Sequence, residues 1–267
     1  MKLKIVDQTK KEIGEKELPN QFKEPIRKDI IKRSVLAIQS HDRQPYGASK
    51  RAGMRASAEL SRRRNNYRGS YGHGISRVPR KIMSSSGTRF NWVGAVAPGT
   101  VGGRRAHPPK ASKIWDQKVN IKENRKAIRS AMAATLSKET VKERGHEAPE
   151  NYPFIITSDI EKISKTKEVK QMLESIGLKN ELQRLTKKVR AGKGKTRGRK
   201  YKITKGPLIV VSSDCKLKKS ACNISGIDII EAKKLNAQLL APGAHPGRLT
   251  LWTDKAIDII TKENLFK

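Results

Sequence analysis

The chain has 267 residues, which is enough for one sizeable domain with its own hydrophobic core. Its 59 Lys and Arg outnumber 25 Asp and Glu, giving a formal net charge of +34, and only 35% of the residues are hydrophobic. A compact body with this charge would repel itself, so the composition excludes an ordinary self-sufficient globule and predicts a polyanionic partner. Nucleic acid is favoured, because Lys and Arg that neutralise phosphates release condensed counterions.

Other partners and compartments are disfavoured by simple patterns. The sequence lacks a run of about 18 apolar residues, so we expect no membrane partner. Residues 1–7 are typical of a strand and not of a signal sequence, which predicts a cytoplasmic protein. Cys215 and Cys222 lie seven positions apart, a spacing that fits no zinc site, so we expect reduced thiols and no metal.

The first predicted elements are the strand over residues 1–7 and a helix. Pro25 can occupy the first helical position, where the missing N–H of proline costs nothing. Apolar residues then recur at spacings of three to five, as they do on one face of a helix. These residues are Ile26, Ile30, Val35 and Ile38.

The most informative segment follows this helix. Residues 43–113 contain sixteen Lys and Arg, one acid (Glu59) and ten of the twenty glycines. They have almost no apolar periodicity and cannot form a core, so the pattern predicts a long loop. A loop longer than about 15 residues inside a compact domain is uncommon and indicates function or disorder.

Aromatic residues are interleaved with the arginines of this loop. Tyr46, Tyr67, Tyr71, Phe90 and Trp92 are five of the twelve aromatic residues in the chain. Unpaired RNA bases stack on aromatic and guanidinium planes, so the composition favours RNA. A disordered basic arm with nonspecific affinity is the alternative, although such arms are usually terminal, rich in lysine and poor in aromatics.

Helices and strands alternate after the loop. Asn120 and Glu123 predict a capped helix that ends near Leu136. The continuous apolar runs 153–157 and 207–211 are typical of strands buried on both faces of a parallel sheet. Between them lie a helix that stops at Gly177 and a second helix over 180–190, the latter carrying Leu182, Leu185 and Val189.

The last predicted elements are strands over 227–230 and 249–252, and a helix capped by Thr253 that carries Ile257 and Ile260. This order predicts an α/β fold, a doubly wound and mostly parallel sheet with one long internal RNA-threading loop. We expect residues 1–42 and 111–267 to form a single globular domain, with residues 43–110 inserted as the loop. Residues 182–206, with eleven Lys and Arg and no acid, form a second basic segment within that domain.

Signatures of catalysis are weak. The nearest match to a dinucleotide-binding motif, from Gly72 to Arg77, ends in Arg and follows no strand. Gly194-Lys195-Thr196 resembles the end of a phosphate-binding loop, but the earlier glycine of that motif is Val189 here. The five histidines lie far apart, so we expect no enzyme, no cofactor and no small-molecule substrate, although a site assembled by folding stays open.

Three motifs in the loop carry a resemblance that extends over essentially the whole chain. They are Lys50-Arg51-Ala52-Gly53, Arg68-Gly69-Ser70-Tyr71-Gly72-His73-Gly74 and Gly102-Gly103-Arg104-Arg105-Ala106-His107-Pro108-Pro109-Lys110. With them the chain resembles the family of universal large-subunit ribosomal proteins conventionally numbered four, in its archaeal form.

The resemblance implies a cytoplasmic protein of the large ribosomal subunit. Its partners would be ribosomal RNA and neighbouring large-subunit proteins, with transient contact to nascent chains. The loop would reach the wall of the peptide exit tunnel and form a constriction there with the loop of another ribosomal protein. The residues implied to line the tunnel are Arg68, Gly69, Ser70, Tyr71, Gly72, His73, Gly74 and Arg77.

The two basic segments supply the candidate contacts to RNA. Tyr67, Tyr71, His73 and Trp92 are the candidates for stacking on bases. A DNA-coating or architectural protein is the main rival, because the charge would suit it, but it has no need of a deep internal loop. The candidates for binding ribosomal RNA are Lys50, Arg51, Arg55, Arg62, Arg63, Arg64, Arg68, Arg77, Arg80, Lys81, Arg89, Arg104, Arg105, Lys110, Lys193, Lys195, Arg197, Arg199 and Lys200.

Overall fold

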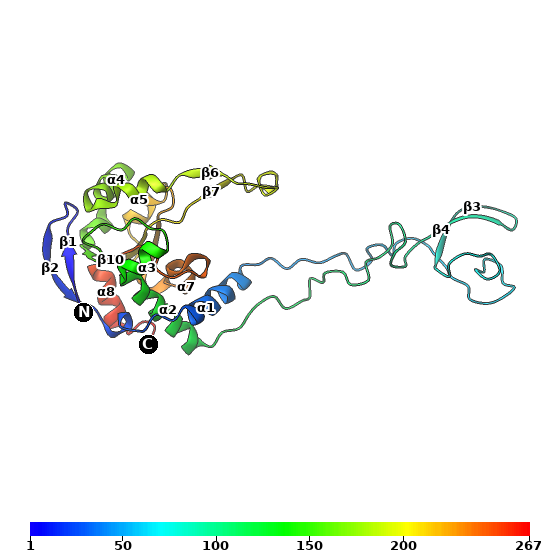
Figure 1. Ribbon diagram of the computed structural model, residues 1–267, viewed down its shortest axis with the longest axis horizontal. Coiled ribbons are helices and arrows are strands. Elements are labelled where there is room, and N and C mark those ends of the chain that lie inside the picture. The colour runs from blue at the N-terminus through cyan, green and yellow to red at the C-terminus, as the bar shows by residue number, and fades with distance from the viewer. The chain divides into compact units, whose positions relative to one another are not determined.

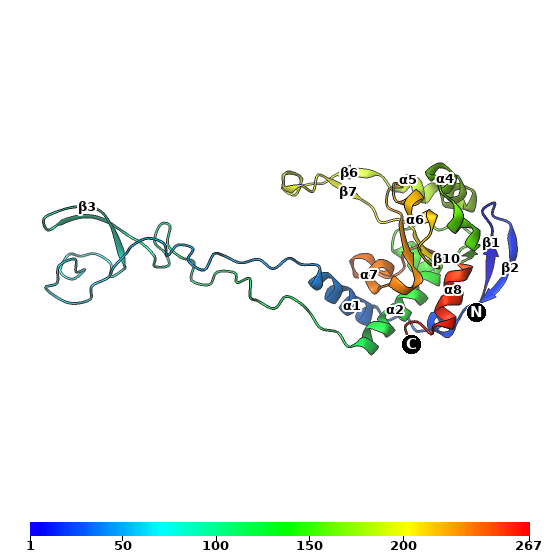
Figure 2. The same ribbon diagram turned by 180° about the vertical axis from the view of Figure 1, so that it is seen from behind.

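A computed structural model describes all 267 residues and divides into two units. We call the unit formed by Met1–Asp42 and Asp116–Lys267 the body, and the unit Arg43–Trp115 the insert. The ribbon views from the front and from behind label their elements (Figures 1 and 2).

The body is built on a six-stranded sheet with the order β2-β1-β5-β10-β8-β9. All neighbouring strands are parallel except β1 and β2, which form an antiparallel pair at one edge. The prediction of a mixed α/β fold with a mostly parallel sheet is therefore confirmed. The strands are β1 (Lys2–Val6), β2 (Glu12–Glu17), β5 (Ile155–Ile156), β8 (Leu208–Val211), β9 (Asp228–Glu231) and β10 (Thr250–Thr253).

Apolar clusters lie on both faces of this sheet. Along β8, Leu208 and Val210 belong to one cluster, whereas Ile209 and Val211 belong to the other. Successive side chains of a strand point to opposite faces, so a strand covered on both sides must be apolar throughout. This explains the continuous run that the sequence shows there. The predicted strand over 153–157 is shorter, because only Ile155–Ile156 pairs with neighbouring strands.

Helices contribute further apolar side chains to each of the two clusters, on the two faces of the sheet. One face is covered by α1 (Lys28–His41), α2 (Ile121–Leu136), α7 (Ala237–Leu240) and α8 (Asp254–Lys262). The opposite face is covered by α3 (Lys138–Glu143), α4 (Thr166–Leu173), α5 (Lys179–Arg184) and α6 (Lys216–Ala221). Thr253 caps α8 as predicted, since its hydroxyl accepts a hydrogen bond from the Ala256 amide at 3.3 Å.

One predicted helix start and one predicted helix cap need correction. Helix α1 begins at Lys28 and not at Pro25. The Ser130 hydroxyl accepts from the Arg27 amide (2.7 Å) and donates to the Pro25 carbonyl (2.8 Å), which keeps this stretch extended. Helix α2 does begin after Asn120, but the Asn120 side chain makes no capping hydrogen bond. Glu123 instead pairs with Arg33 on α1, at 3.1 Å.

The predicted helix over 180–190 is wrong in its second half. Helix α5 ends at Arg184, and residues 187–189 form strand β6 (Lys187–Val189), which is paired with β7 (Tyr201–Ile203) in an antiparallel hairpin. Leu185 is buried in the body whereas Val189 is 60% exposed, so the two never share one apolar face. The stop at Gly177 is confirmed, since its φ of 102° interrupts the helix.

The insert contains a hairpin that the sequence did not predict. Strands β3 (Arg80–Ser86) and β4 (Arg89–Gly94) pair antiparallel within the stretch that was expected to be structureless. Alternation is present only along β4, where Phe90 and Trp92 are half-buried and their neighbours are exposed. Four of the seven residues of β3 are exposed and three are serines, so the usual apolar signal of a strand is missing.

The segment of the insert that follows α1 and the segment that leads back to α2 run side by side, and we call them the two arms of the insert (Figure 1). The Ala48 amide donates to the Pro109 carbonyl at 2.9 Å. At Gly53, whose φ is +71°, an added Cβ would lie 2.5 Å from the Arg104 nitrogen. Glycine is required there by both the left-handed backbone and the close approach of the opposite arm.

Candidate nucleic-acid interface

Only Arg184 and Lys205, near the two ends of the second basic segment, pair with a carboxylate of the protein; the other cations of the two basic segments form no ion pair. Every ion pair in the structure joins residues outside 43–115 and outside 185–204. The carboxylates of the body that form ion pairs therefore take their cations from outside these two stretches. The insert and the hairpin of β6 and β7 present Lys and Arg whose charge only an external anion can neutralise.

The predicted phosphate-binding residues lie in these two places. Those from Lys50 to Lys110 belong to the insert, and those from Lys193 to Lys200 belong to the loop that joins β6 to β7. All of them are exposed except Arg80 and Lys81, which are half-buried at the start of β3.

Residues 61–69 form a turn that is held against the β3–β4 hairpin. The Asn66 side-chain amide donates to the Ser61 hydroxyl at 2.7 Å, and the Tyr67 hydroxyl donates to the Gly87 carbonyl at 3.2 Å. Gly69 and Ser70 are buried within the insert, whereas the other residues predicted to line a passage are exposed or half-buried. Those other residues are Arg68, Tyr71, Gly72, His73, Gly74 and Arg77.

Arginines already lie over aromatic rings in this part of the insert. The rings of Tyr67 and Phe90 are 5.2 Å apart, and those of Phe90 and Trp92 are 5.3 Å apart. Arg77 lies 4.7 Å from the Tyr71 ring centre, and Arg80 lies 5.7 Å from that of Trp92. Such surfaces suit unpaired bases, which stack on both kinds of plane. Phe90 was not among the predicted stacking residues, although its place between Arg89 and Asn91 on an alternating strand could have indicated it.

A second aromatic cluster, also absent from the predicted sites, joins the two ends of the insert. The rings of Tyr46 and Trp115 are 4.9 Å apart. The Arg43 guanidinium lies 4.4 Å from the Trp115 ring centre, and the Lys113 ammonium lies 4.9 Å from it. No local pattern relates these residues, because about 70 positions of sequence separate Tyr46 from Trp115.

The second basic segment has a defined shape as well. Beside the β6–β7 pairing, the Arg190 guanidinium donates to the Arg199 carbonyl at 3.1 Å. Lys187 lies 4.0 Å from the ring centre of Tyr201, an aromatic residue that the sequence interpretation left out. The backbone of the hairpin thus has a defined conformation, with Arg190 and Lys187 held against it.

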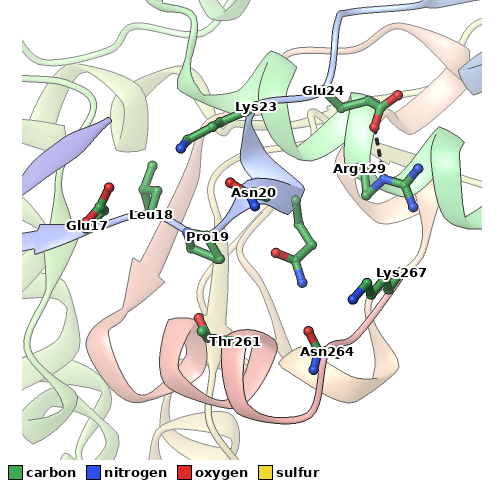
Figure 3. Close-up of a pocket in the computed structure, with 11 residues that line it drawn as sticks. Glu17, Leu18, Pro19, Asn20, Lys23, Glu24, Arg129, Thr261, Asn264 and Lys267 are labelled. Carbon is green, nitrogen blue, oxygen red and sulfur yellow. Dashed lines mark hydrogen bonds and ion pairs between the residues drawn. The ribbon is translucent and has the colours of Figure 1, made fainter.

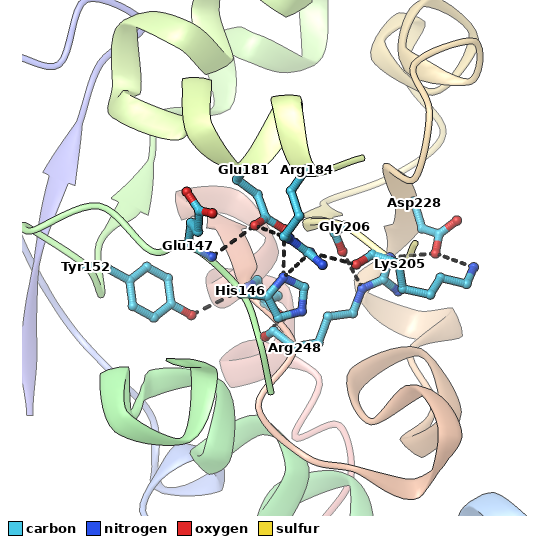
Figure 4. Close-up of polar contacts among 10 residues, drawn as sticks. His146, Glu147, Tyr152, Glu181, Arg184, Lys205, Gly206, Asp228 and Arg248 are labelled. Carbon is cyan, nitrogen blue, oxygen red and sulfur yellow. Dashed lines mark hydrogen bonds and ion pairs between the residues drawn. The ribbon is translucent and has the colours of Figure 1, made fainter. Parts of the chain in front are cut away.

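The base of this hairpin is tied to the body by a buried polar network (Figure 4). Glu181 accepts from Arg184 Nε (2.9 Å) and from the Glu147 amide (3.0 Å), and it contacts His146 Nδ1 at 2.7 Å. Arg184 also donates to the Lys205 carbonyl at 3.0 Å. Both ends of the second basic segment are therefore held by one carboxylate and its arginine.

A second carboxylate continues this network. Asp228 accepts from Arg248 Nη2 at 2.6 Å and pairs with the Lys205 ammonium at 2.9 Å. Arg248, which is fully buried, also donates to the Gly206 carbonyl at 2.8 Å. Residues 205 and 206, where the hairpin returns to β8, are thus fixed by charge-assisted hydrogen bonds.

The network perturbs the ionisation of its members. Burial alone would raise the pKa of Glu181, but the hydrogen bonds from His146, Arg184 and the Glu147 amide outweigh it and lower the pKa to about 2. Burial lowers the pKa of His146 despite the neighbouring Glu181 carboxylate. Burial likewise lowers the pKa of Arg248.

The comparison with known proteins gives one family. The sequence model of the ribosomal protein L4/L1 family matches residues 16–263. The chain belongs to this family. Among its relatives are proteins named large ribosomal subunit protein uL4. The protein of Nanoarchaeum equitans is 51% identical over 257 residues, covering 96% of each chain. That of Archaeoglobus fulgidus is 43% identical over 262 residues, covering 97% of this chain and 98% of its own length.

Membership in the L4/L1 family agrees with the prediction that the chain is not an enzyme, because the family consists of ribosomal proteins.

In parallel α/β sheets, ligands usually bind beyond the carboxyl ends of the strands. Here the Glu161 carboxylate occupies that position. It accepts from the Ser212 amide and the Thr253 hydroxyl, both at 2.9 Å, and so joins the ends of β8 and β10.

A cavity of about 720 Å³ in the body lies between residues 17–24 and the C-terminal residues (Figure 3). Glu24 on its wall is paired with Arg129 at 3.0 Å.

No group of His, Cys, Asp and Glu side chains is arranged to hold a metal ion. No helix combines the length and the apolar composition needed to cross a membrane.

Proposed function

We propose that this protein is a structural constituent of the large ribosomal subunit in the cytoplasm, and that it binds ribosomal RNA through the insert and the β6–β7 hairpin. The observation that carries the proposal is that no intramolecular ion pair involves the insert or residues 185–204 of the second basic segment. Its relatives of similar length are named as proteins of the large ribosomal subunit.

Phosphate contacts supply most of the affinity in this proposal. Each exposed Arg or Lys that neutralises a phosphate releases a counterion, and guanidinium groups can form two parallel hydrogen bonds to phosphate oxygens. The rings of Tyr67, Tyr71 and Trp92, together with His73, offer faces to unpaired bases. The body contributes the fixed base of the second hairpin and presents Lys193–Lys200 at a defined place.

The insert also contributes to the wall and the constriction of the polypeptide exit tunnel. Residues 68–77 line or approach the passage and contact nascent chains transiently, and the loop of another ribosomal protein lies opposite. The family resemblance supports this role. The fixed turn at 61–69 supports it too, because a constriction requires a segment of stable shape.

Sedimentation tests the assignment to the ribosome. A tagged copy expressed in an archaeal host should travel with the large subunit through a sucrose gradient. Its presence only at the top of the gradient would contradict the proposal.

RNA binding is tested by salt dependence. Affinity for a folded fragment of ribosomal RNA should fall by about 0.7 to 0.9 log units per log unit of salt for each neutralised phosphate. Equal affinity for duplex DNA at the same salt would favour the rival, an architectural DNA-binding protein.

The tunnel role is tested separately. Replacing residues 60–80 by a short Gly-Ser linker should widen the passage in cryo-electron microscopy maps of the large subunit. Replacing residues 191–199 of the β6–β7 loop by the same linker is the control and should leave the passage unchanged. An unaltered passage in the first variant would contradict the tunnel role and leave RNA binding untouched.

A further inference from the structure

The insert contains a hollow whose chemistry differs from that of its surroundings. It has a volume of about 580 Å³ and lies between residues 57–68 and the β3–β4 hairpin. Its walls include Glu59, Tyr67, Arg68, Arg80 and Trp92. The hollow thus combines a carboxylate, two aromatic residues and two guanidinium groups.

Glu59 is the feature that needs an explanation. It is the only acid in the insert, among sixteen Lys and Arg, and it belongs to no ion pair of the chain. A carboxylate repels phosphate, so it weakens the main interaction of this segment. A carboxylate can only accept hydrogen bonds, and its natural partner here is a ligand with N–H groups.

The position of Glu59 is fixed by its backbone. Its amide donates to the Arg80 carbonyl at 3.4 Å, and the Arg80 amide donates to the Glu59 carbonyl at 3.1 Å. This bridge places the carboxylate beside the start of β3 and on the wall that Trp92 shares. The backbone of Glu59 is therefore fixed at the edge of the hollow, and its side chain is exposed and open to a ligand.

The hollow also offers an aromatic face and a cation with an unsatisfied hydrogen-bond donor. Trp92 is half-buried and is backed by the Phe90 ring at 5.3 Å. Arg80 lies over Trp92 and donates through Nη2 to the Ser76 carbonyl at 2.9 Å. The Arg80 Nε atom is buried and has no hydrogen-bond partner. Its N–H can therefore donate to an acceptor atom of the ligand.

The arrangement of donors selects one base. Guanine carries two adjacent donors on its Watson–Crick edge, N1–H and the N2 amino group, which match the two oxygens of a carboxylate. Uracil has a single N–H between two carbonyls, which repel a carboxylate, and adenine and cytosine place an acceptor beside their amino group. We infer that the hollow binds one unpaired guanine of RNA, with Glu59 accepting from its Watson–Crick edge and Trp92 stacking on its ring. This inference rests on the proposed RNA-binding function.

The test uses the full chain and two short RNA probes, a uridine oligomer and the same oligomer with one central guanosine. Quenching of Trp92 fluorescence reports binding, in a background in which Trp115 is replaced by Phe and Trp252, buried in the core of the body, contributes a constant emission. The protein with Glu59 unchanged should bind the guanosine probe about ten-fold more tightly than the uridine probe, which is the discrimination that a side chain paired with a base edge usually gives.

The variant Glu59→Gln distinguishes recognition of guanine by Glu59 from general electrostatic attraction between the protein and RNA. Removing one negative charge should raise the affinity for the uridine probe slightly and should abolish the preference for guanosine. Glu15→Gln is the matched control, because Glu15 is an exposed residue of β2 with no ion pair, and it changes the net charge equally. The preference for guanosine should survive in that control.

Two outcomes would overturn the inference. One is equal affinity of the unsubstituted hollow for both probes. The other is a Glu59→Gln variant that binds both probes more tightly in the same proportion. In either case RNA binding itself would remain, whereas failure of both probes and of folded ribosomal RNA to bind would contradict the proposed function.

Discussion

Replacing Glu181 by Gln removes the carboxylate that ties the base of the β6–β7 hairpin to the body. The side chain is fully buried and is hydrogen-bonded to His146, Arg184 and the Glu147 amide (Figure 4). Glutamine keeps the shape but loses the charge, so the guanidinium of Arg184 loses its counterion. Removing one charge of such a pair is costly because the other charge, here on the half-buried Arg184, stays in place without its partner.

The magnitude follows from the ionisation of this group. The pKa of Glu181 is about 2 in the folded protein, against an ordinary value of 4.5. Each unit corresponds to about 1.4 kcal/mol, so the ionised carboxylate contributes about 3 kcal/mol. Because the folded pKa is the lower one, this stabilisation is fully present above pH 4.5. It is lost as the pH falls from 4.5 toward 2.

Urea denaturation of the parent protein and of the Glu181→Gln variant measures this difference in the free energy of unfolding. Trp252 is buried in the core of the body and reports its unfolding, once Trp92 and Trp115 are replaced by Phe. The free energy of unfolding of Glu181→Gln should be lower by about 3 kcal/mol at neutral pH. The gap should close as the pH approaches 2.

The control is Glu12→Gln, which removes an exposed ion pair with Lys4 and should change stability far less. Equal stability of the two variants would refute the reasoning. So would a gap between Glu181→Gln and the parent that does not change with pH below 4.5.

Three further predictions concern the insert and the body. Gly53→Ala should separate the two arms and increase protease cleavage there, whereas Gly74→Ala, with a similar φ but open space around it, should not. Replacing Arg by Ala at positions 62–64 should lower the salt slope of RNA binding by about 2, and an unchanged slope would show that these side chains contact no phosphate. Thr253→Ala removes both the cap of α8 and the hydrogen bond to Glu161 and should cost at least about 1 kcal/mol of stability in thermal unfolding, and no loss would contradict the capping role.

Some features of the fold could be predicted because they depend on neighbouring residues in the chain. The strand at Leu208–Val211 is a continuous apolar run, and burial on both faces requires that run. Gly177 ends a helix because it adopts a φ that other residues avoid. The two basic segments were located by charge alone.

Features that depend on distant partners could not be predicted. The extended backbone at Arg27 is fixed by Ser130, about 100 residues away, although Pro25 looks like a helix start. Leu185 and Val189 have helical spacing, but the body has room for only the first of them. The β3–β4 hairpin is held partly by Tyr67, whose hydroxyl bonds to Gly87 across the turn.

The sequence by itself determined where the charge lies, which strands are buried on both faces and which family the chain resembles. Each of these depends on composition or on spacing within one segment. The tertiary structure decided which cations lack an internal partner, how Glu181 joins His146 to Arg184, and that Glu59 shares a hollow with Trp92. These depend on distances between residues far apart in the chain, and only folding sets those distances.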